Sequence, residues 1–137
     1  MTAFGSGAPL IIDTSAWARQ RDPQVAPRWA EAIRAGRFAS CPVAALEILA
    51  SARDEADFDI LDRSLAALPQ APVTETVCRA ALAASGRLQA RRRLPAADYL
   101  IAAAAAERGF GVLHEDRHFD LLATVLGFES VKLSTMF

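Results

Sequence analysis

Cysteine and histidine are scarce in this chain, and long apolar runs are missing. The 137 residues contain two cysteines and two histidines, with no CxxC pair or Cys/His cluster, which argues against a structural zinc site. Cys41 and Cys78 are both predicted to be buried small hydrophobic residues in a reducing cytoplasm. No apolar stretch is long enough to span a bilayer, and residues 1–12 do not have the pattern of a signal peptide.

A strong charge of either sign is also missing. The chain has 15 basic and 16 acidic residues, a formal net charge of −1, which argues against bulk attraction to nucleic acid or membrane but leaves a local basic patch open. Its length, its hydrophobic content of 53% and the lack of repeats or linkers predict a single globular domain over residues 1–137.

Short apolar runs alternate with segments of helical periodicity. Strands are predicted at residues 10–12, 38–40, 111–114 and 130–133. Helices are predicted at residues 14–19, 23–35, 42–51, 54–68, 75–90, 95–108 and 119–126, the fourth with a buried stripe of Phe58, Leu61, Leu65 and Leu68. This alternation predicts an α/β fold with a parallel sheet covered on both faces.

Two acidic residues follow predicted strands. Asp13 ends the run 10–12, and Asp116 comes two residues after the strand 111–114. The carboxyl ends of parallel strands lie at one edge of a sheet, where open α/β sheets bind ligands, so both acids are expected at that edge. The alternatives are an ordinary helix cap for Asp13 and a surface-loop acid for Asp116.

Two further acids lie within apolar helical segments. Asp98 is the only charge between Arg93 and Glu107, and Glu47 shares a predicted inward face with Val43, Leu46 and Ala50. An acid in such surroundings costs roughly several kcal/mol unless it is paired, protonated or bound to a metal. The alternatives are a frayed, partly exposed position for Glu47 and a favourable helix dipole for Asp98.

Four acids placed in this way could meet at one edge of one sheet. Converging carboxylates repel each other, so some must be protonated or a cation must lie among them. Oxygen ligands select hard ions such as Mg²⁺ or Mn²⁺, and such ions suit the attack of water on a phosphodiester. The sequence leaves open whether the four acids converge, how many ions they bind and which carboxylate assists as general base. It also leaves open whether Glu115 or Asp120 joins the site.

The same residues resemble the PIN domain family. The resemblance lies in Asp13–Ser15 after a strand, Glu47 in an apolar helix, the segment 94–103 around Asp98 and the segment 113–119 around Asp116. Their order and spacing are similar to those of small bacterial PIN proteins, the VapC-type toxins of toxin–antitoxin pairs. The resemblance covers nearly the whole chain.

The resemblance implies a three-layer α/β/α sandwich around a parallel sheet of four to five short strands. It also implies a cytoplasmic endoribonuclease that depends on Mg²⁺ or Mn²⁺ and hydrolyses RNA. Asp13, Glu47, Asp98 and Asp116 would form the metal-binding, catalytic centre, and Ser15 would orient Asp13 or a bound water. A cognate VapB-type antitoxin would occupy the active groove with its tail, and the protein would form a homodimer.

Arginines flank the candidate acids in the sequence. Arg91, Arg92, Arg93 and Arg117 are weaker candidates for binding RNA phosphates. The run 91–93 could instead complement a helix dipole, and the same side chains could hold an acidic antitoxin segment.

Two other functions remain open at this point. A catalytically silent module that binds RNA or protein would have the same fold without metal dependence. A phosphoaspartate-type phosphatase or receiver domain would also use an acid after a strand. It fits less well, because Ser15 stands where a phosphatase would have a second acid, and the chain's single lysine, Lys132, lies in the last predicted strand.

Overall fold

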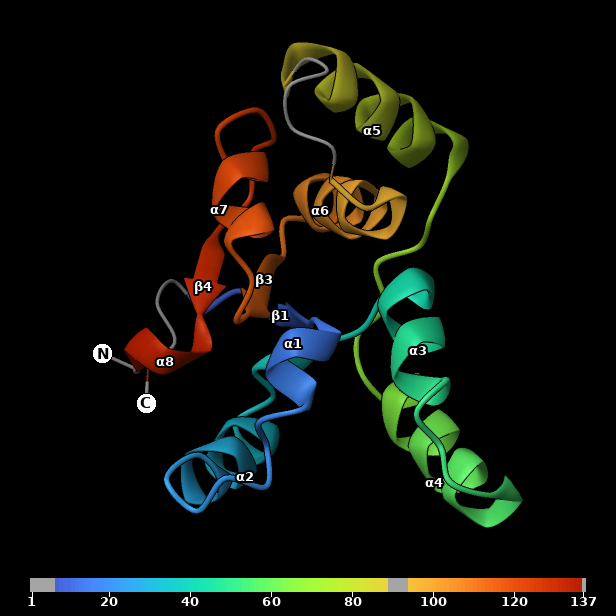
Figure 1. Cartoon of the computed structure of the whole chain (residues 1–137), viewed down its shortest axis with the longest axis vertical. Helices are drawn as coiled ribbons and strands as arrows, with labels where there is room; N and C mark the ends of the chain where they lie inside the picture. The colour runs from blue at the N-terminus through green and yellow to red at the C-terminus, as the bar shows by residue number, and fades with distance from the viewer. Residues whose placement is uncertain (1–6, 89–93, 137) are drawn as a thin grey trace.

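A four-stranded parallel sheet forms the centre of the protein (Figure 1). The computed structural model describes residues 7–88 and 94–136. The sheet order is β2-β1-β3-β4, with β1 (Leu10–Ile12), β2 (Phe38–Ala39), β3 (Gly111–His114) and β4 (Ser130–Lys132). Ile12 pairs with Leu113, so the carboxyl ends of β1 and β3 lie side by side, as predicted.

Helices cover both faces of the sheet. They are α1 (Thr14–Trp17), α2 (Ala26–Arg34), α3 (Pro42–Leu49), α4 (Glu55–Ala66), α5 (Glu75–Leu88), α6 (Ala96–Arg108), α7 (Arg117–Leu122) and α8 (Leu133–Met136). Successive strand side chains point to opposite faces. Ile11 and Val112 therefore enter a core with α5, α6 and α7, whereas Leu10, Ile12 and Leu113 enter a second core with α1 and α2. The predicted α/β/α sandwich is confirmed.

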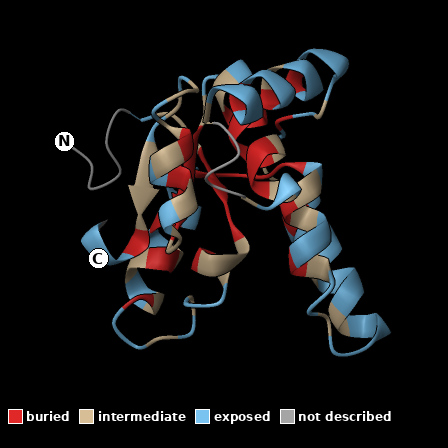
Figure 2. Ribbon diagram, turned by 45° about the horizontal axis from the view of Figure 1, so that its top comes forward, coloured by how far each residue is buried: buried red, intermediate tan, exposed pale blue. Residues whose placement is uncertain are grey.

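Helix α6 is the most deeply buried helix of the described chain (Figure 2). It packs against β1, β3, α3, α5 and α7, and the four buried alanines at residues 102–105, within a run of five, allow these close approaches. The helix ends at Gly109, whose φ of 74° is left-handed. Asp98 lies in its first turn, and its carboxylate contacts His118 of α7. None of the helices in residues 7–88 and 94–136 is long and apolar enough to cross a membrane.

Two predictions about burial are wrong. Leu65 of α4 is buried, but Phe58 is 41% exposed, because α4 packs chiefly against α3 and projects from the rest of the protein (Figures 1 and 2). Cys78 is exposed, whereas Cys41 is buried as expected. On α5 the neighbouring Val77 fills the inward position, so the Cys78 thiol is left on the outer face.

The starts of two helices also differ from the sequence prediction, and one short helix was not predicted. α2 begins at Ala26 instead of Pro23, because residues 22–25 form a turn in which the Gln24 amide donates to Asp22. α7 begins at Arg117, two residues before the predicted start, because Asp116 caps it. The short α8 was not predicted from the sequence.

Candidate active site

The two strand-end acids lie at one edge of the sheet and each caps a helix. Asp13 caps α1, accepting the Ser15 amide at 3.0 Å, and Asp116 caps α7, accepting the His118 amide at 2.9 Å. The helix-cap alternative is therefore correct as well. It does not compete with a role at the sheet edge, because each carboxylate has two oxygens and several lone pairs.

Ser15 joins the ends of β1 and β3. Its hydroxyl donates to Asp13 Oδ2 at 2.5 Å and accepts the Glu115 amide at 2.9 Å. Asp13 is only 5% exposed, so its orientation depends on this hydroxyl and on the Ser15 amide. The serine therefore restrains the Asp13 carboxylate with two hydrogen bonds.

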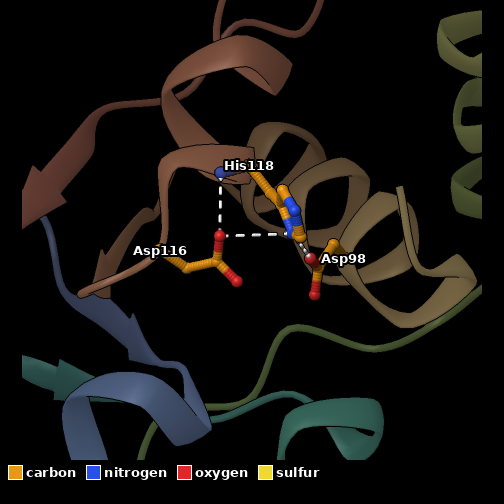
Figure 3. Close-up of side chains that lie close together, drawn as sticks. All are labelled: Asp98, Asp116 and His118. Atoms are coloured by element: carbon orange, nitrogen blue, oxygen red, sulfur yellow. Dashed lines mark hydrogen bonds and ion pairs between the residues drawn. The ribbon is translucent and has the colours of Figure 1, made fainter. Parts of the chain in front are cut away.

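Asp98 and Asp116 meet around an imidazole (Figure 3). His118 Nδ1 lies 2.8 Å from Asp98 Oδ2 and 3.2 Å from Asp116 Oδ1. One ligand atom from each of the three residues lies within 4.8 Å of the others. The 2.8 Å contact requires a proton between the imidazole and Asp98. In Figure 3 the second oxygen of each carboxylate carries no such contact and points into the space beside the cluster.

His118 is not one of the site residues predicted from the sequence. The residue lies in the first turn of α7 and two positions after Asp116, but 20 residues from Asp98. Periodicity gives no signal for a polar residue at the exposed start of a helix. Only the packing of α7 against α6 brings its ring to Asp98.

Electrostatic repulsion links the four predicted acids. Burial raises the pKa of Asp98, the charges of Asp13 and Asp116 raise it further, and the hydrogen bond from His118 opposes both. The pKa of Glu47 is also raised, by partial burial and then by the charges of Asp13 and Asp98. The charge of Asp13 therefore acts on both Glu47 and Asp98, and that of Asp116 acts on Asp98.

Glu47 lies on a different face of α3 than predicted. The buried residues of α3 are Ala44 and Ile48, while Leu46 is 68% exposed and Glu47 is exposed. The predicted inward face is therefore wrong. Residues 42–49 are apolar almost all round, so the helical period could not select a face.

His114 supports Asp116 from inside the protein. The ring is fully buried, and its Nδ1 accepts the Asp116 amide at 3.1 Å. This leaves the proton on Nε2, which donates to Ser130 Oγ at 2.6 Å, and that hydroxyl donates to Asp120 at 2.8 Å. Burial lowers the pKa of His114, so the ring is neutral. The chain of hydrogen bonds holds the backbone of Asp116 in place.

Glu115 and Asp120 do not join the acidic cluster. Glu115 accepts the Ser134 amide at the start of α8, and its other oxygen lies 3.8 Å from Arg19. Asp120 is 58% exposed and bonds to Ser130. Both acids have partners on the side of the protein that carries β4 and α8.

The predicted arginines are only partly described. Arg91, Arg92 and Arg93 lie outside the described residues. Arg117 is exposed at the first position of α7, directly after Asp116. Its charge is therefore available next to the acidic cluster.

The donor set fits a divalent cation. Asp98, Asp116 and His118 offer three ligand atoms close together, and the charge of Asp13 acts on both Glu47 and Asp98. A cation at this position would offset the repulsion that helps to raise the pKa values of Glu47 and Asp98.

A parallel α/β/α sandwich with acids at the carboxyl ends of β1 and β3 is the arrangement of a PIN domain. The model of that family matches residues 10–125, and the chain belongs to the PIN domain family. Within it, the chain is 39% identical over 124 residues to ribonuclease VapC18 of Mycobacterium tuberculosis, covering 86% of this chain and 90% of that protein. It is 37% identical over 121 residues to ribonuclease VapC51 of the same organism, covering 85% and 87% of the two chains.

Solved structures agree with this assignment. A chain in the crystal structure of VapBC-5 from Mycobacterium tuberculosis, a member of the VapBC family of toxin–antitoxin systems, superposes with a TM-score of 0.65 at 25% identity, covering 91% of this chain and 98% of that one. A chain of DNA-bound VapBC from Salmonella typhimurium gives a TM-score of 0.70 at 14% identity, covering 92% and 98%. The second likeness shows the shared fold.

Proposed function

We propose that this protein is a metal-dependent endoribonuclease that hydrolyses RNA phosphodiester bonds and acts as the toxin of a toxin–antitoxin pair. The observation that carries the proposal is the cluster of Asp98, Asp116 and His118 beside the paired carboxyl ends of β1 and β3, where the charge of Asp13 also acts on Asp98. The VapC ribonucleases that the chain resembles support the reaction. RNA hydrolysis of this kind would take place in the cytoplasm, and residues 1–137 would act as one PIN-like domain.

The residues at this site would have separate roles in the reaction. A bound Mg²⁺ or Mn²⁺ would activate water and neutralise phosphate charge. Asp13, Asp98, Asp116 and Glu47 would hold the ion. Ser15, whose hydroxyl donates to Asp13 Oδ2, would orient that carboxylate.

Two further residues act around these ligands. His114 holds the backbone of Asp116 through its Nδ1. Arg117, exposed directly after Asp116, would bind a phosphate oxygen of the RNA.

RNA cleavage with and without metal tests the proposal. We expect the full chain to degrade RNA with Mg²⁺ or Mn²⁺ and to stop when EDTA is added. Asp13→Asn is expected to lower the rate about a hundredfold or more, because the buried carboxylate at the centre loses its charge. The matched control is Asp59→Asn on α4, which makes the same chemical change at an exposed acid. Equal degradation by all samples would refute the proposal, and RNA binding without cleavage would favour the silent binding module.

A protein partner is supported by exposed apolar surface near α4. Leu46 is 68% exposed and Ile60 is 63% exposed. A cavity of about 430 Å³ lies between α1 and α4, and Trp17, Arg21 and Ile60 are among its lining residues. We propose that the cognate antitoxin covers this surface, with an apolar segment against Ile60 and acidic groups near Arg21.

Co-purification tests this partner. Ile60→Asp is expected to weaken capture of the antitoxin at least about tenfold, because a charge would be buried in the interface. The matched control is Leu82→Asp, which changes another exposed apolar residue, 74% exposed on α5. Equal capture by both variants would place the partner elsewhere. The proposed homodimer is tested separately by measuring the mass of the free toxin in solution.

A further inference from the structure

His118 stands among the candidate metal ligands without being one of the acids that define the site. Its Nδ1 approaches Asp98 and Asp116 from the first turn of α7. The side chain is 38% exposed, so the ring lies on the open side of the cluster and can adjust to a ligand. The other histidine of the chain, His114, is fully buried with both ring nitrogens in hydrogen bonds.

The spacing of the three donors suits one ion. Two ligands on adjacent corners of an octahedron, each about 2.1 Å from the ion, lie about 3 Å apart. His118 Nδ1 lies 2.8 Å from Asp98 Oδ2 and 3.2 Å from Asp116 Oδ1, on either side of that value. A cation could therefore replace the proton now shared in this cluster with small movements of the side chains.

We infer that His118 is a direct metal ligand through Nδ1, and that it makes the site select Mn²⁺ over Mg²⁺. This inference rests on the proposed metal-dependent function. Mg²⁺ prefers oxygen ligands throughout, whereas imidazole nitrogen binds first-row transition ions well. The neighbouring carboxylates are oxygen donors, which Mn²⁺ also accepts. A mixed site of this composition therefore favours Mn²⁺.

Electron spin echo spectroscopy of bound Mn²⁺ tests the ligand directly. The full chain, purified without a histidine tag and with ¹⁵N-labelled histidine, is loaded with MnCl₂ alone. A directly bound imidazole is expected to give ¹⁵N coupling to the manganese, which is lost in His118→Asn. The signal can come only from His118 or His114, and His114→Gln distinguishes them because it should keep the coupling.

Calorimetric titration with MnCl₂ and MgCl₂ tests the selectivity. The wild-type chain is expected to bind Mn²⁺ at least about tenfold more tightly than Mg²⁺, the size of effect typical of a metal-site residue. His118→Asp replaces the nitrogen with oxygen and should reduce this preference roughly tenfold. Asp59→Asn, on the exposed face of α4, should leave both affinities unchanged.

The possible failures separate the two proposals. Bound Mn²⁺ without histidine coupling in the wild-type protein would overturn the ligand assignment and leave the metal-dependent ribonuclease intact. An unchanged preference in His118→Asp would overturn the selectivity. No bound Mn²⁺ at millimolar concentration would overturn both this inference and the proposed metal-dependent reaction.

Discussion

Replacing Asp98 with asparagine should abolish RNA cleavage and make the protein more stable. Asp98 is only 6% exposed, and a ligand atom of Asp116 lies within 4.8 Å of it. At an effective dielectric constant of about 20, two such charges repel by about 3 kcal/mol. The hydrogen bond from His118 to the charged carboxylate returns about 1.5–3 kcal/mol, and asparagine can still accept part of it.

The net gain expected for Asp98→Asn is therefore about 1 kcal/mol in the free energy of unfolding. For a chain of 137 residues this corresponds to a rise in Tm of about 4 °C. Thermal unfolding in EDTA at neutral pH measures it. Addition of Mn²⁺ should raise the Tm of the wild-type protein and leave that of the variant nearly unchanged, because a ligand stabilises only the state that binds it.

The advantage of Asp98→Asn should depend on pH in a defined direction. The pKa of Asp98 is raised in the folded protein above its ordinary value of 3.8, so the charged form is the destabilising one. The gain should be full above the folded pKa and should disappear as the pH falls toward 3.8. If Asp98→Asn instead lowers the free energy of unfolding by more than about 1 kcal/mol at neutral pH, the reasoning is refuted and Asp98 is a structural helix residue. The control Asp59→Asn measures the effect of the same change at an exposed helix position.

Three further predictions concern the support of the site. A Cβ at Gly111 would lie 2.8 Å from the Glu129 carbonyl oxygen, so Gly111→Ala should lower the free energy of unfolding, measured in urea, by about 1–3 kcal/mol. The control Gly86→Ala has open space on α5 and should raise it by about 0.5–1 kcal/mol. Burial lowers the pKa of His114 below its ordinary 6.5, so its contribution to stability should be lost as the pH falls below 6.5, and His114→Gln should remove that part of the pH dependence. Ser15→Ala leaves the Glu115 amide without its acceptor, so it should lower the free energy of unfolding by about 1–3 kcal/mol and slow RNA cleavage. The control Ser64→Ala, on exposed α4, should change the free energy of unfolding by less than about 0.5 kcal/mol.

Each of these predictions has an outcome that contradicts it. Equal stability of the two glycine variants would mean that β3 and the Glu129 turn are not in close contact. An unchanged pH profile in His114→Gln would mean that the imidazole is not the group that titrates. Normal cleavage by Ser15→Ala would show that Asp13 keeps its orientation without the hydroxyl.

The sequence by itself determined the fold class and the position of two acids at one edge of the sheet. Apolar runs that alternate with helical periods define a parallel sheet, because each such run must be buried on both faces. Asp13 and Asp116 follow two of these runs, and adjacent parallel strands place their carboxyl ends together. These features depend on residues close in the sequence and on the topology that their order imposes.

The tertiary structure alone decided which side chains face each other. Residues 42–49 are apolar almost all round, so only the packing of α3 against α6 and α1 shows that Glu47 lies on an exposed face. His118 became part of the site through a partner 20 residues away, and Glu115 turned from it toward Arg19 and Ser134. The physical reason is that periodicity reports the conformation of one segment, whereas a side chain's neighbours depend on contacts between segments distant in the chain.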